Sequence, residues 1–152
     1  MYEEEKMNFY FWQRWLFIVS ILLLVFGLAL AFFNQSPFFD FLFNHQVNPV
    51  FWKSMPLNEN TSAFQHWAYG VLGATVAGWG IFLACITHYP FRRKEAWAWN
   101  CLVLGVSLWY VVDTSLSYLS HVIFNMAFNT VLVLLLVPPL AFTRTFFFKE
   151  NH

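Results

Sequence analysis

The chain has 152 residues, of which 59% are hydrophobic and 11% are charged, and its formal net charge is zero. A typical soluble domain is about 25% charged. Twenty Phe and eight Trp are more aromatic surface than a water-soluble chain of this length can bury. The composition therefore predicts one domain, residues 1–152, whose main partner is the lipid bilayer. The zero net charge argues against nucleic acid as a partner.

Four apolar stretches, in chain order, are each long enough for a membrane-spanning helix. They predict helices over about residues 12–33, 64–88, 96–118 and 121–143. A helix rises 1.5 Å per residue, so about 20 residues cross about 30 Å of hydrocarbon. Because backbone polar groups in lipid must bond internally, a helix is the expected form of each stretch. The sequence predicts an all-α fold, a four-helix transmembrane bundle.

The first stretch has a second interpretation, a cleaved signal peptide, because Ala29-Leu30-Ala31 resembles a cleavage site. The leader before it carries Glu3, Glu4 and Glu5 rather than a purely basic segment, and the apolar core is long. These features favour a membrane helix.

The basic residues predict the orientation. With four crossings and the N-terminus inside, all of them except Lys53 fall on the cytoplasmic side, in agreement with the positive-inside rule. Both termini are therefore expected in the cytoplasm, in a plasma membrane or a bacterial inner membrane. The eight basic residues are Lys6, Arg14, Lys53, Arg92, Arg93, Lys94, Arg144 and Lys149.

The predicted extracytoplasmic loop, residues 34–62, is rich in aromatic residues. Ser36-Pro37 is typical of a helix start, and a short helix is expected to follow it with Phe38, Phe39, Phe41, Leu42 and Phe43. So apolar a loop is expected to lie in the membrane interface or to fold over the outer mouth of the bundle. An interfacial anchor and a functional lid both remain open.

The second helix carries small residues at steps of three and four, on one face: Gly70, Gly73, Ala74, Ala77, Gly78, Ala84 and Cys85. Membrane helices gain van der Waals contact by close backbone approach, so this face is predicted to meet another helix. The short connections 88–95 and 117–121 predict that helices two, three and four are neighbours in chain order, with Trp109 facing the small residues. Pro138-Pro139 is predicted to kink or end the fourth helix.

Polar residues within three of the helices are the candidate site. Asp113 is the one charged residue between Glu95 and Arg144, and a carboxylate at this depth needs a partner. We expect these groups to converge in the outer half of the bundle, with His66, Asp113 and Asn125 within direct or single-water hydrogen-bonding reach beneath the Phe-rich loop. The candidate ligand-binding residues are His66, Tyr110, Asp113, His121, Asn125 and Asn129.

Several functions fit such a cluster. It could be a structural hydrogen-bond network, or the floor of a pocket for a lipophilic small molecule. Asp113 with a histidine could instead perform acid–base chemistry on a lipid-like substrate. Ligation of haem or a metal by His66 and His121 is disfavoured, because both lie near the water interface. Cys85 and Cys101 form no metal-binding or redox motif and are expected to pack within the bundle.

On balance the sequence favours a non-enzymatic accessory or lipophilic-ligand-binding membrane protein. Other membrane subunits are possible partners. No catalytic residue, cofactor or metal site is assigned.

Overall fold

The computed structural model describes residues 2–53 and 55–148, with side chains from Met7 onward. The described residues form helices joined by short turns, with no strand among them. Two short segments, η1 and η2, are π-helical. The elements are α1 (Tyr2–Phe33), α2 (Pro37–Phe39), η1 (Asp40–Asn44), α3 (His45–Trp52), α4 (Glu59–Ile86), η2 (Thr87–Phe91), α5 (Ala96–Leu119) and α6 (Ile123–Phe147).

Four of the helical stretches are long and apolar enough to cross a membrane: Met7–Phe33, Glu59–Phe91, Ala96–Leu119 and Ile123–Phe147. The predicted all-α fold and its four long helices are therefore confirmed. The second helix begins earlier than predicted because Asn58 caps it. The Asn58 Oδ1 accepts the backbone N–H of Thr61 at 2.8 Å, which satisfies one of the free donors of the first turn.

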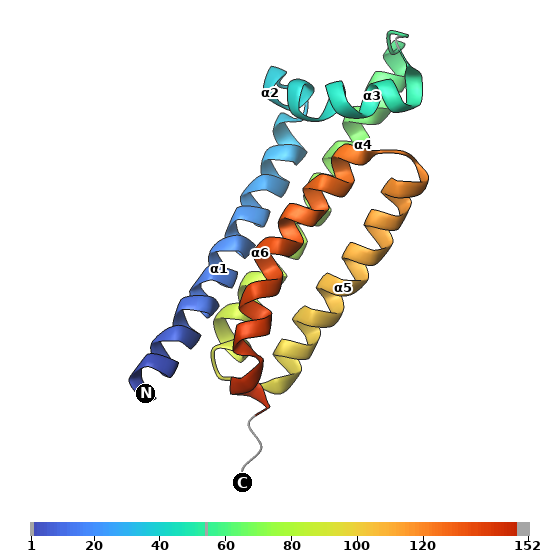
Figure 1. Ribbon diagram of the computed structural model, residues 1–152. Coiled ribbons are helices and arrows are strands. Elements are labelled where there is room, and N and C mark those ends of the chain that lie inside the picture. Colours follow the sequence, from blue (N-terminus) through green and yellow to red (C-terminus); the bar gives the residue numbers. More distant parts are fainter. Residues whose placement is uncertain (1, 54, 149–152) are drawn as a thin grey trace.

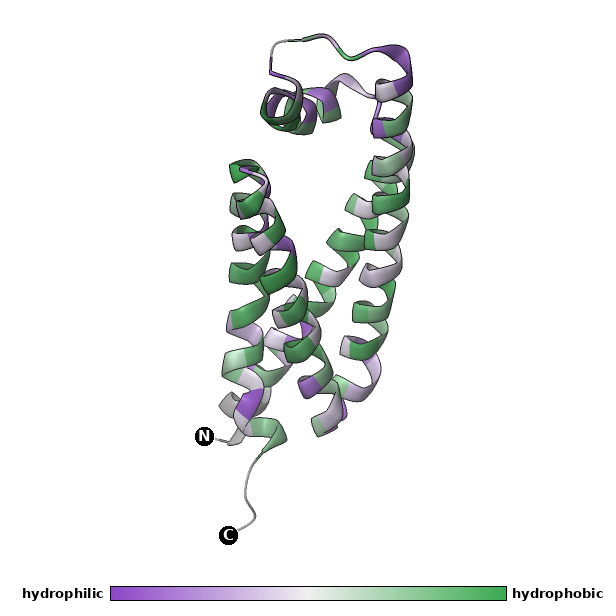
Figure 2. Cartoon of the chain, turned by 90° about the vertical axis from the view of Figure 1, so that its right-hand side faces the viewer, coloured by the Kyte–Doolittle hydropathy of each residue, from purple (hydrophilic) through white to green (hydrophobic). Residues whose placement is uncertain are grey.

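The long helices run alongside one another, and the start of α1 and the end of α6 lie at the same end of the molecule (Figure 1). We call this the termini end. At the opposite end, the loop end, residues 37–52 of α2, η1 and α3 lie across the helices. Most of each long helix consists of hydrophobic residues, shown in green in Figure 2. The same view shows that the helices spread apart toward the loop end.

The main helix pair is α1 with α4, whose backbones touch through small residues. A Cβ atom built on Gly27 would lie 2.7 Å from the Gly73 carbonyl oxygen and 2.8 Å from the Ala77 Cα. One built on Gly80 would lie 2.5 Å from the Leu24 backbone nitrogen. Only glycine permits such an approach, which gives van der Waals contact along the whole pair.

The predicted small-residue face is thus confirmed at Gly73, Ala77 and Ala84, which are buried. Its partner is α1, whereas the sequence interpretation expected the third helix. At Gly78 an added Cβ meets nothing within 4 Å, so this glycine is outside the interface. The interpretation erred because it weighed the glycines of α4 and not Gly27.

The second pair is α5 with α6. α5 packs mainly on α6 and is the least buried of the four spans. The predicted order of neighbours is therefore correct for α5 and α6 but not for α4 and α5. Trp109 of α5 does meet α4, through the ring of Trp79 at a centroid distance of 5.4 Å. Cys85 and Cys101 are exposed on the helix surfaces rather than packed inside.

α6 continues through Pro138-Pro139 to Phe147, so of the two predicted outcomes, a kink or an end, the end is wrong. Proline has no N–H, so Pro139 leaves the carbonyl of Leu135 without its usual helical donor. The indole Nε1 of Trp15 in α1 donates to that carbonyl at 2.9 Å. A neighbouring helix thus satisfies the freed group, and the helix persists.

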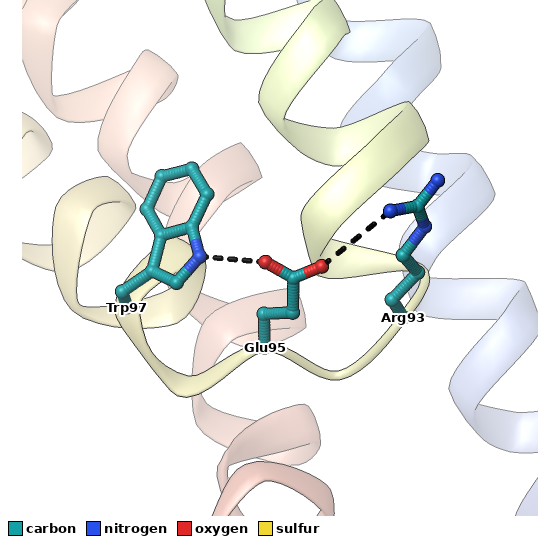
Figure 3. A network of polar contacts seen from close by, with 3 residues as sticks. All are labelled: Arg93, Glu95 and Trp97. Atoms are coloured by element: carbon teal, nitrogen blue, oxygen red, sulfur yellow. Dashed lines mark hydrogen bonds and ion pairs between the residues drawn. The ribbon is translucent and has the colours of Figure 1, made fainter.

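The turn between η2 and α5 is held by Glu95 (Figure 3). Its carboxylate accepts a hydrogen bond from Trp97 Nε1 at 2.6 Å, and its other oxygen lies 3.9 Å from Arg93 Nη1. Lys94 just before it has a φ of 59°, in the left-handed region that reverses the chain. This turn sets the start of α5 at Ala96.

The short helix expected after Ser36-Pro37 is present and extends to Trp52. Phe43 in its middle contacts aromatic rings of two long helices, Phe26 of α1 at 6.1 Å and Phe124 of α6 at 5.4 Å. Residues 37–52 are therefore anchored over the loop end of the helices. Such aromatic contacts add about 0.5–1.5 kcal/mol each beyond area burial.

Candidate functional site

Asp113 lies at the interface of α5 and α6, where one of its two carboxylate oxygens, Oδ1, accepts hydrogen bonds. Its Oδ1 accepts the Asn125 amide at 2.8 Å and the Ser117 hydroxyl at 3.3 Å. The same Asn125 Nδ2 also donates to the Ser117 Oγ at 2.7 Å. The expected approach of Asp113 and Asn125 is thus present. Ser117 reaches this network because it lies one helical turn after Asp113.

Two further candidates lie on the same helix pair. Asn129, which is 2% exposed, donates to the Thr114 Oγ1 at 3.4 Å. The Tyr110 hydroxyl is 3.5 Å from the Thr130 Oγ1. Together these bonds form a polar seam between α5 and α6, in which Ser117 and Asn129 are buried and Asp113 and Asn125 are half-buried.

His66 belongs to a different group. Its Nδ1 is 3.2 Å from the Asn34 Oδ1 at the end of α1, and its Nε2 is 3.2 Å from the Ser62 Oγ. Both ring nitrogens therefore have other partners, and no direct hydrogen bond joins His66 to Asp113 or Asn125 among the described residues. The cause is the packing of α4 on α1, which turns His66 toward Asn34.

A wide, open groove of about 1130 Å³ runs along the loop ends of α1 and α4, with His66 and Asn34 among its walls. The sequence interpretation missed Asn34, although an asparagine at the end of an apolar helix is a signal that could have been weighed. Asn34 Nδ2 donates to the Leu30 carbonyl at 3.0 Å, which fixes the side chain that holds His66.

The sequence interpretation placed His121 as the first residue of the fourth helix, and this is wrong. It lies in the turn before α6, with a φ of 58°, and its side chain is exposed. This conformation ends α5 and redirects the chain into α6. His121 therefore serves the turn and is not part of the polar seam.

A cavity of about 290 Å³, which we call the loop-end cavity, lies between the two helix pairs beneath residues 37–52. Ser117 and Asn125 give it a polar side, and most of its remaining wall is apolar or aromatic. The lining residues are Leu30, Phe43, Val47, Phe51, Tyr69, Leu72, Leu116, Ser117, Ser120, Val122, Phe124 and Asn125. Apolar walls with a few converging polar groups are typical of small-molecule sites.

The sequence revealed Asn125 but not the apolar wall of this cavity. Phe43 and Phe51 come from the segment across the loop end, Leu72 from α4 and Leu116 from α5. Their convergence depends on how far the helix pairs diverge, and no residue pattern reports that distance.

The described residues contain no group of three or more His, Cys, Asp or Glu side chains placed to hold a metal ion. Within the same residues, His66 and His121 lie in separate surroundings and do not form a pair. The arrangement can offer hydrogen bonds and apolar contact in the loop-end cavity.

These features define an all-helical protein with four helices long and apolar enough to span a membrane and a cavity at one end of the helices. Comparison of the chain with protein-family models, with curated proteins and with solved structures gives no match. The function is therefore argued from the cavity itself.

Proposed function

We propose that this chain is a non-enzymatic, multi-pass membrane protein that holds a lipophilic small molecule in the loop-end cavity. The observation that carries the proposal is the composition of the wall, in which the aromatic side chains of Phe43 and Phe51 face a site with one polar side at Ser117 and Asn125. A volume of about 290 Å³ is near the lower bound of small-ligand pockets.

The hydrogen bonds of Asn125 indicate what kind of molecule fits. Its amide nitrogen already donates to Asp113 and Ser117, and no described residue donates to its Oδ1. Because Asn125 lines the cavity, this oxygen is available to a ligand bound there. A ligand with one hydroxyl or N–H donor and an otherwise apolar body satisfies this acceptor and fills the aromatic part.

Filling the cavity from α3 should displace the molecule. Val47→Trp places a large side chain where Val47 lines the cavity, whereas Val50→Trp makes the same change on the same helix outside the lining. We expect Val47→Trp to lower ligand affinity about tenfold or more, since overpacking costs about 1–3 kcal/mol. Mass spectrometry of small molecules that co-purify with each purified variant measures this.

Val50→Trp should retain the molecule at the wild-type level. Co-purification of bulk phospholipid alone, with no lipophilic compound enriched in the wild-type chain, would contradict the proposal. Equal loss in both variants would show that retention does not depend on the cavity.

The alternative of acid–base chemistry requires a histidine beside Asp113. The described partners of Asp113 are Ser117 and Asn125, and His66 is held by Asn34 and Ser62. No observation favours that chemistry over binding.

We also propose that the termini end faces the cytoplasm, as the positive-inside rule indicates for Arg14, Arg144 and residues 92–94. Single cysteines at Asn58 and Lys94, both exposed, test it in a background in which Cys85 and Cys101 are serine. An impermeant maleimide applied to intact cells should label position 58 and leave position 94 unlabelled. Labelling of position 94 alone would reverse the orientation.

A further inference from the structure

A cavity smaller than the loop-end cavity lies near the termini end of the chain, between α1 and η2. Its volume is about 230 Å³, and its walls are Tyr10, Gln13, Arg14, Phe17, His88 and Arg92. We call it the basic pocket. Its lining residues are all different from those of the loop-end cavity. A role for the basic pocket is therefore independent of the function proposed for that cavity.

The basic pocket is built on a fixed frame. Gln13 is 5% exposed, and its Nε2 donates to the backbone carbonyl of Thr87 at 3.1 Å, which ties α1 to η2. Thr87 is 1% exposed, and its hydroxyl donates to the Leu83 carbonyl at 2.7 Å. The ring of Phe17 lies 5.4 Å from that of His88. These contacts hold the walls from which the basic side chains extend.

His88 lies within η2, and Arg92 follows directly after it as the C-cap residue. Pro90 within η2 lacks an N–H and cannot continue the α-helical pattern. Arg92 is also in a helical conformation, so His88 and Arg92, four residues apart, lie about one turn apart. Both line the pocket opposite Arg14 of α1.

The pocket gathers positive charge in a chain of zero net charge. Arg14 and Arg92, both exposed, are among its lining residues, together with His88 and Tyr10. Among the side chains that the structure describes, the one ion pair is Arg93 with Glu95, and neither residue lines this pocket. No described carboxylate therefore neutralises Arg14 or Arg92.

These side chains match the chemistry of a phosphate group. A guanidinium presents parallel N–H donors that suit phosphate oxygens, and arginine is the usual residue for such recognition. Phe17 lies on the same wall one turn further into the apolar span, where an acyl chain would continue. We propose that the basic pocket binds the phosphate of an anionic phospholipid, with Arg14 and Arg92 as its main contacts.

The test is a titration of the full chain with phosphatidylglycerol in phosphatidylcholine nanodiscs, followed by native mass spectrometry. Arg14→Gln with Arg92→Gln should weaken phosphatidylglycerol binding about tenfold or more. The matched control is Arg93→Gln with Arg144→Gln, which removes the same charge from exposed positions outside the pocket. The control should bind as the wild type does.

Equal weakening in the control would show a diffuse attraction and overturn the proposal, as would equal retention of phosphatidylcholine and phosphatidylglycerol by the wild-type chain. Inorganic phosphate in large excess should not displace the lipid. Displacement would assign the pocket to free phosphate instead.

If the glutamine variant does not fold, as judged by circular dichroism, the double variant Arg14→Lys with Arg92→Lys replaces it, because lysine keeps the charge but not the paired donors of arginine. Unchanged lipid binding in that variant would overturn the role of the guanidinium groups.

Discussion

Gly73→Ala should destabilise the chain markedly, while Gly78→Ala on the same helix should not. A Cβ atom at position 73 would lie 2.6 Å from the Gly27 carbonyl oxygen and 2.9 Å from the Ala31 Cα, both in the backbone of α1. Backbone atoms cannot move aside as a flexible side chain can. The two helices must separate, at a cost of about 1–3 kcal/mol, and Gly73→Leu should cost more.

Gly78→Ala is the matched control because an added Cβ there meets nothing within 4 Å. Alanine favours a helix over glycine by about 1 kcal/mol, so this variant should be as stable as the wild type or slightly more stable. Thermal unfolding of the purified chains in detergent measures both. Equal melting temperatures for the two alanine variants would mean that α1 and α4 are not in backbone contact.

Asp113→Leu should also lower stability, while Asp113→Asn should preserve most of it. Leucine removes the acceptor of the Asn125 amide, which is 2.8 Å from Asp113 Oδ1, and leaves a half-buried donor with fewer partners. Leaving such groups unsatisfied costs about 1–3 kcal/mol. Asparagine keeps an oxygen in the same place and can still accept that bond.

The same unfolding measurement compares the two variants at Asp113. A large loss in Asp113→Asn as well would show that the negative charge itself is required, and the network would then not be a simple set of hydrogen bonds. No loss in Asp113→Leu would remove any structural role for the polar seam between α5 and α6. Mass spectrometry of the small molecules that co-purify with Asp113→Asn and with the wild-type chain tests the loop-end cavity separately from stability.

The sequence by itself determined the elements of this protein. An apolar run of sufficient length in lipid has to be a helix because its backbone groups have no other partners. The four long helices therefore followed from hydropathy, and the short helix after Ser36-Pro37 followed from a proline at a helix start. The pairing of Asp113 with Asn125 followed from the short turn between α5 and α6, since two polar residues at similar depth on adjoining helices meet.

Only the tertiary structure decided which helix faces meet. Lipid is as apolar as leucine, so hydropathy cannot tell a lipid-facing side from a buried one. The contact of α1 with α4 depends on Gly27 meeting Gly73 and Ala77, a match between distant residues that chain order does not suggest. That match turned His66 toward Asn34 and away from Asp113. Backbone contact holds α1 to α4, and hydrogen bonds hold α5 to α6. The two pairs diverge toward the loop end, and the loop-end cavity lies between them.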